Sequence, residues 1–78
     1  MRQRTRRDPI DFPLRGEHIT LDALLKASGL ASSGGAAKAL IAGGGVRVNG
    51  EPERRRGRKL RAGDAVSVGE RVVHLRVG

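Results

Sequence analysis

The chain has 78 residues, with 16 Lys and Arg against 8 Asp and Glu, so its formal net charge is +8. This length predicts one small domain, and the lack of cysteine excludes a disulfide framework and a thiolate metal site. The excess of positive charge favours a polyanionic partner, with nucleic acid as the leading class and an anionic membrane second.

The N-terminal residues 1–9 carry four arginines and no apolar periodicity, which predicts a flexible basic arm before a single domain over residues 10–78. No apolar segment approaches the ~20 residues of a membrane span, and no apolar signal-peptide stretch follows the basic start. We therefore expect a cytoplasmic protein that has no membrane partner.

A short edge strand that leads into a helix is predicted over residues 12–19, because apolar residues alternate roughly there and Pro13 stands near the start. Thr20 is expected to cap the helix that follows. Three leucines at helical spacing form one apolar stripe of that helix, and Gly29 ends it.

Either Ser32 or Ser33 is expected to cap a second helix, which the glycines at 43–45 terminate. Apolar residues three and four apart form its inner face, namely Ala37, Leu40 and Ile41. Its outer face is expected to carry Gly34, Gly35 and Lys38.

Strands are predicted in the second half of the chain. Residues 46–48 alternate inward and outward, so Arg47 faces solvent, and Asn49-Gly50 is typical of a two-residue hairpin turn. Leu60 is expected to anchor the return strand, and further strands follow a turn at residues 61–64. In the last strand the residues Val73, Leu75 and Val77 share one face. The pattern predicts an α+β fold, with two short helices packed on a small, mostly antiparallel sheet.

The basic run over residues 54–61 contains six cations and no acidic residue among its eight positions. Such charges repel one another, since a Debye length of ~8 Å does not fully screen neighbours this close. An edge strand needs only one or two lysines against aggregation, so anion binding is favoured over a solvated face. Strict alternation would place three arginines on the face of the buried Leu60, a conflict that a bulge at Gly57 would resolve, so the sequence leaves open which arginines face outward.

Enzymatic chemistry is not supported by the residues available. His18 and His74 are the only histidines, and neither has the spacing of a metal site or of a nucleophile and base pair. The carboxylates show no acid and base pairing, and no phosphate-loop lysine motif occurs. We expect no enzymatic activity, no catalytic residue, no metal, no cofactor and no small-molecule substrate.

Residues 20–68 resemble the S-four RNA-binding domain, also called the alpha-L RNA-binding motif. The matching segments are residues 21–26, 29–33, 40–41, 46–50 and 63–66. The serine and glycine helix start and the basic run look most like the small stand-alone bacterial members of the YbcJ type. The resemblance implies a non-catalytic module that binds structured RNA, either ribosomal or transfer RNA.

The second helix start departs from the broader family, in which many members carry an arginine directly after the capping serine where this chain has Gly34. Lys38 falls where the family often has a basic residue. Free amides at a helix start can meet a phosphate, and glycine leaves the approach open, although the glycines can also serve close packing. The predicted RNA-binding residues are Ser33, Gly34, Gly35, Lys38, Arg47, Arg54, Arg55, Arg56, Arg58, Lys59 and Arg61.

Two other functions use the same features. A duplex DNA or nucleoid binder would need the same charge, and a ribosome-associated adaptor would instead present an apolar patch to a protein. Phe12 is the only aromatic residue, so base-stacking platforms are absent and recognition of the phosphate backbone is expected. We expect a monomer.

Overall fold

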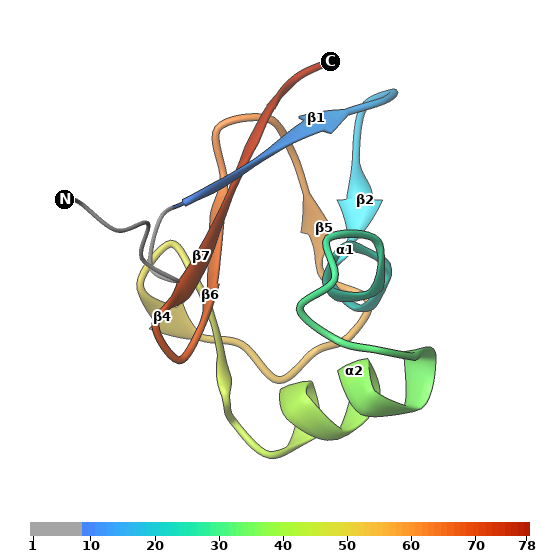
Figure 1. Ribbon diagram of the computed structural model, residues 1–78, viewed down its shortest axis with the longest axis vertical. Helices are drawn as coiled ribbons and strands as arrows, with labels where there is room; N and C mark the ends of the chain where they lie inside the picture. The colour runs from blue at the N-terminus through green and yellow to red at the C-terminus, as the bar shows by residue number, and fades with distance from the viewer. Residues whose placement is uncertain (1–8) are drawn as a thin grey trace, which may run out of the picture.

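The computed structural model describes residues 9–78 and arranges them as two helices beside a five-stranded and a two-stranded sheet (Figure 1). The helices are α1 (Leu21–Ala27) and α2 (Gly34–Ala42). The strands are β1 (Ile10–Leu14), β2 (Ile19–Thr20), β3 (Val46–Val48), β4 (Glu51–Pro52), β5 (Lys59–Leu60), β6 (Ala65–Val68) and β7 (Arg71–Val77). All but the last residue of the predicted N-terminal arm lies outside the described residues.

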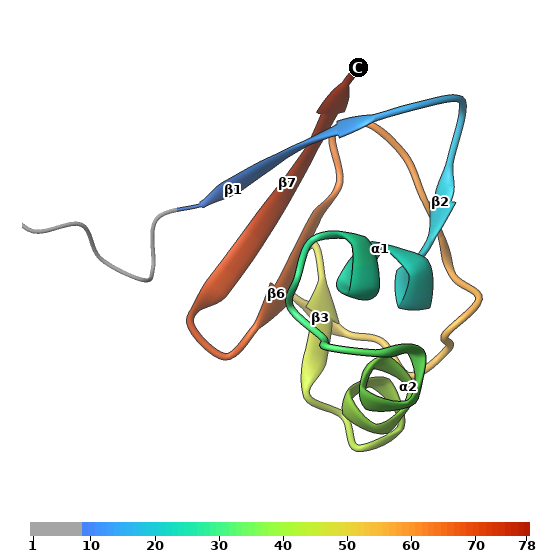
Figure 2. The same ribbon diagram turned by 45° about the vertical axis from the view of Figure 1, so that its right-hand side comes forward.

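The larger sheet has the strand order β1-β7-β6-β3-β4, and the smaller sheet pairs β2 with β5. β1 runs parallel to β7, whereas the other pairs are antiparallel. Both helices lie on the same side of the larger sheet (Figure 2). The predicted α+β fold with a mostly antiparallel sheet is therefore confirmed.

An aliphatic core fills the space between the helices and the sheet. The leucine stripe of α1 is fully buried, as are Ala37 and Ile41 of α2, while Leu40 is half-buried. β3 alternates as predicted, with Val46 and Val48 inside and Arg47 exposed. The remaining buried hydrophobic residues are Leu14, Ala31, Leu60, Val66, Val73 and Leu75.

The predicted return strand through the basic run is wrong. β4 ends at Pro52, which lacks the N–H that a continuing ladder needs, and residues 53–58 form a loop. Only Lys59 and Leu60 re-enter a strand, and they pair with β2 rather than with β3. Leu60 is buried as expected, and no bulge forms at Gly57, because there is no ladder there to interrupt.

Val73, Leu75 and Val77, which were predicted to share one face, alternate along β7, but burial along that face ends at Leu75. Val73 and Leu75 are buried, whereas Val77 is 86% exposed. β6 pairs with β7 only as far as His74, and Leu75 still bonds to the backbone of Gly63 and Asp64. At Arg76 and Val77, β1 is the neighbouring strand. The end of β7 therefore extends past the core.

The Asn49-Gly50 turn is confirmed, since both residues adopt positive φ angles of 52° and 86°. The Asn49 side chain also connects this turn to the one before β6. Its Nδ2 donates to Asp64 Oδ1 at 3.1 Å, and its Oδ1 accepts the amide of Ala65 at 2.9 Å. Two turns that are distant in sequence are thereby held together.

The two helices begin differently. Ser33 caps α2, because its Oγ accepts the Ala36 amide at 3.1 Å. Thr20 does not cap α1 through its side chain, since its hydroxyl donates to Asp22 Oδ1 instead. The first amides of α1 are satisfied by the basic run, whose residues accept them through the backbone carbonyls of Arg56 and Arg58.

Candidate nucleic-acid interface

Residues 53–58, which we call the arginine loop, join β4 to β5. The loop is anchored at both ends, because Glu53 N donates to Val46 O at 3.0 Å and Leu21 N donates to Arg58 O at 2.9 Å. A third bond runs from Asp22 N to Arg56 O at 3.1 Å. The segment between β4 and β5 passes between α2 and the start of α1 (Figures 1 and 2). The loop is therefore ordered by its backbone before its side chains are considered.

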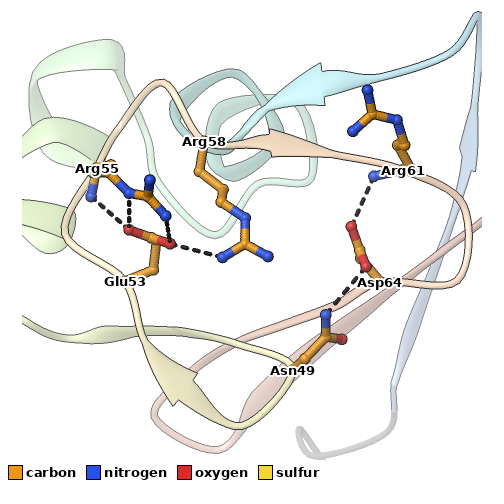
Figure 3. A network of polar contacts seen from close by, with 6 residues as sticks. All are labelled: Asn49, Glu53, Arg55, Arg58, Arg61 and Asp64. Carbon is orange, nitrogen blue, oxygen red and sulfur yellow. Dashed lines mark hydrogen bonds and ion pairs between the residues drawn. The ribbon is translucent and has the colours of Figure 1, made fainter.

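Glu53 is the first residue of the loop and is 7% exposed. Its Oε2 accepts the amide of Arg55 at 3.0 Å and the Nε of Arg55 at 2.9 Å. Its Oε1 accepts Arg55 Nη2 at 3.1 Å and Arg58 Nη1 at 2.8 Å (Figure 3). The hydrogen bonds from Arg55 and then from Arg58 hold the pKa of Glu53 far below its usual range.

This carboxylate divides the predicted cations into two groups. Arg55 and Arg58 form ion pairs with Glu53. Within residues 9–78, no carboxylate binds the side chains of the other cations of the basic run, which are Arg54, Arg56, Lys59 and Arg61. The sequence analysis missed this division, since it counted charges from residue 54 and left out the carboxylate one position earlier.

Arg54 connects the arginine loop to the end of α2. Gly44, just beyond the helix, has a φ of +81°, and a Cβ built there would lie 2.9 Å from Arg54 Nη2. The guanidinium group therefore occupies the space that a larger residue would fill. Its charge also lies near the C-terminal end of α2, where helix carbonyls carry partial negative charge.

The start of α2 is open to solvent. Gly34, Gly35 and Lys38 are exposed, as predicted. A Cβ at Gly34 would meet nothing within 4 Å, and one at Gly35 would meet only Ser33 Oγ at 3.8 Å. Neither glycine is thus required for close helix packing, and contact between this helix start and a phosphate stays a prediction.

Arg47 is separate from the arginine loop in its bonding. It projects from the solvent side of β3, and its Nη1 donates to Gly50 O at 3.3 Å on the same hairpin. Arg61 is held through its backbone, since its amide donates to Asp64 Oδ2 at 2.8 Å (Figure 3). The cations of the arginine loop and of β5 are thus neighbours along the chain, whereas the Arg47 side chain bonds to its own hairpin.

The described part of the chain contains no group of three or more His, Cys, Asp or Glu side chains that could hold a metal ion. No helix in residues 9–78 is long and apolar enough to cross a membrane.

Comparison with known proteins identifies the family of the chain. The sequence profile of the S4 domain matches residues 12–76. The chain belongs to the S4 domain family. A protein of Bacillus subtilis (strain 168) described as "Probable ribosome maturation protein RlbA" is 48% identical over 52 residues, which cover 67% of this chain and 73% of that protein. The resemblance to the S-four domain is confirmed, and the match to this small S4-domain protein agrees with the stand-alone subgroup.

The ion pairs of Glu53 predict how stability depends on pH. Because the pKa of Glu53 is lowered in the folded state, its contribution is complete above the unfolded-state pKa of about 4.3 and is lost as pH falls below it. We expect Glu53→Gln to be less stable than the parent at pH 7, with the difference shrinking below about pH 4. Urea unfolding at several pH values measures this, and a difference that stays constant down to about pH 3 would contradict it.

Proposed function

We propose that this chain is a non-catalytic RNA-binding module that recognises structured RNA, ribosomal or transfer RNA, mainly through the phosphate backbone. The observation that carries the proposal is the arginine loop, which presents four arginines on a backbone bonded to β3 and α1. Membership of the S4 domain family and the net charge of +8 support the same function.

Arginine is suited to this surface because its planar guanidinium group can bind a phosphate through two hydrogen bonds. A loop that is already ordered loses less conformational freedom when it binds than a free basic segment would. The six cations of residues 54–61 exceed the single carboxylate of Glu53 by five, so the region keeps a strong positive potential.

Recognition through backbone shape follows from the side chains present. Phe12, the only aromatic residue of the chain, is half-buried on β1, so no stacking platform for bases is offered. The cations meet phosphates, which position the protein without reading base sequence. We therefore propose that the arrangement of phosphates in a folded RNA determines binding.

The relative described as a ribosome maturation protein supports a ribosome-related RNA as the partner. We propose that the chain works as a cytoplasmic monomer over a single domain from residue 10 onwards. Neither description of its similar proteins names a catalytic activity, and we propose that it needs no cofactor, metal, membrane or small-molecule substrate.

Two alternative functions remain distinguishable from this one. A ribosome-associated adaptor would present an apolar patch, but Val77 is the one large hydrophobic residue that residues 9–78 expose. A duplex DNA binder would use the same charges. Competition between a structured RNA and duplex DNA of equal length separates the proposed RNA binder from a DNA binder, and we expect the chain to prefer the RNA.

Two double variants, each of which removes two positive charges, test whether the cations of residues 54–61 bind RNA. Arg56→Gln with Lys59→Gln changes the proposed interface, while Arg15→Gln with Arg71→Gln changes exposed cations elsewhere. We expect the interface pair to weaken binding to structured RNA about tenfold and to lower the slope of log affinity against log salt by about two. Fluorescence anisotropy between about 50 mM and 200 mM salt measures both quantities.

The control pair should change RNA affinity much less than the interface pair, because its cations lie outside the arginine loop and β5. Equal losses from both pairs would show that only net charge matters. Binding by the parent protein that is absent, or that does not depend on salt, would contradict the proposed function itself.

The start of α2 is tested by substitutions that affect stability and binding in opposite directions. Gly34→Ala and Gly35→Ala find open space, so each should raise the free energy of unfolding by up to ~1 kcal/mol. Both should weaken RNA binding if the helix amides meet a phosphate. Gly44→Ala is the control, since its positive φ should lower stability by about 1–2 kcal/mol.

Thermal unfolding and RNA titration of the same three variants decide the outcome. A gain in stability with unchanged RNA affinity for Gly34→Ala and Gly35→Ala would remove the start of α2 from the binding site and leave the arginine loop in place.

A further inference from the structure

A buried carboxylate inside a surface that binds a polyanion requires an explanation. Glu53 is the one charged or polar residue that is buried among residues 9–78. By charge alone it weakens the attraction of the arginine loop for phosphates. Its position is fixed by the backbone, because Glu53 N donates to Val46 O at the start of β3. The residue therefore stands at the anchored first position of the loop, and its carboxylate contacts Arg55 and Arg58.

The contacts of Glu53 leave much of both guanidinium groups available. Each guanidinium group has five N–H donors. Arg55 gives Glu53 one from Nε and one from Nη2, and Arg58 gives it one from Nη1. The Arg55 side chain is 75% exposed and the Arg58 side chain is 33% exposed. Donors that do not face the carboxylate are thus left for an outside acceptor.

We propose that Glu53 is a positioning residue, which holds the guanidinium groups of Arg55 and Arg58 as a fixed pair that receives one phosphate of the RNA. This inference rests on the proposed function, since it assumes that the arginine loop binds RNA. Both arginines reach the same carboxylate oxygen, Oε1, so their guanidinium groups meet at one point (Figure 3). Long side chains held in this way have less rotamer freedom to lose when a phosphate binds.

Positioning and charge make opposite predictions for one substitution. Two guanidinium groups and one carboxylate give the cluster a charge of +1, which Glu53→Gln raises to +2. If charge decides the RNA affinity, this variant binds more tightly than the parent. If positioning decides it, the variant binds more weakly although its net charge has increased.

Glu51 provides a matched control. It lies two positions earlier on β4, is exposed, and its side chain forms no hydrogen bond or ion pair with the described residues. Glu51→Gln makes the same change in net charge at almost the same place. We expect Glu51→Gln to bind structured RNA at least as tightly as the parent and Glu53→Gln to bind about fivefold more weakly than Glu51→Gln.

Glu53→Asp separates geometry from charge in a second way. It keeps the negative charge but is shorter by one methylene, so we expect it to hold the two arginines less well and to bind RNA more weakly than the parent. Because charge is unchanged, a purely electrostatic role for Glu53 predicts no loss. This variant keeps the inference testable if Glu53→Gln does not fold.

The salt dependence distinguishes positioning from a loss of folded protein. A smaller folded fraction lowers the amount of active protein in a stoichiometric titration but leaves the salt slope unchanged. Loss of one phosphate contact lowers the slope by about one. Equal or tighter binding by Glu53→Gln relative to Glu51→Gln, at full activity, would overturn the inference. Failure of the parent protein to bind RNA would instead overturn the proposed function.

Discussion

The hydrogen bonds that converge on the Glu53 carboxylate join Arg55 and Arg58 within the arginine loop, whose backbone is anchored to β3 and α1. They bring Arg55 and Arg58 together at donor to acceptor distances of 2.8–3.1 Å, although like charges held close together repel. The loop also directs the backbone carbonyls of Arg56 and Arg58 towards the start of α1. Lys59 and Leu60 then continue into the short sheet with β2.

This arrangement connects the stability of the fold to the proposed binding surface. The first amides of α1 need acceptors, and the arginine loop supplies them through Arg56 O and Arg58 O. Arg54 lies against Gly44, just beyond the C-terminal end of α2. One loop therefore contacts both helices while it presents cations to solvent. A substitution in the loop has to be interpreted with stability and RNA affinity measured together.

Local patterns in the sequence were sufficient for elements whose partners are close in the chain. Asn49-Gly50 specified its turn because both positions favour positive φ. The serines at 32 and 33 indicated a helix start, and Ser33 provides the cap because its Oγ accepts the amide three residues on. The alternation in β3 was likewise confirmed. The packing of the helices on the sheet follows from these elements and the aliphatic periodicity.

The errors arose where a distant or neighbouring residue overrides the local pattern. The basic run has the composition of a charged strand, but Glu53 just before it redirects its side chains and α1 takes its carbonyls. Thr20 was predicted to cap α1, but backbone carbonyls of this same loop accept the first amides of the helix instead. For the candidate site, the cations were identified from charge, whereas their division into paired and unpaired groups required coordinates.

Amide hydrogen exchange tests the central role of Glu53 most directly. In the parent protein, the amides of Arg55 and Asp22 should exchange slowly, because Glu53 Oε2 and Arg56 O accept them. In Glu53→Gln both should exchange faster, while Ala36, which is capped by Ser33, should not change. If Arg55 and Asp22 exchange in the parent at the rate of an unstructured chain, the arginine loop is a free basic segment and the account is contradicted.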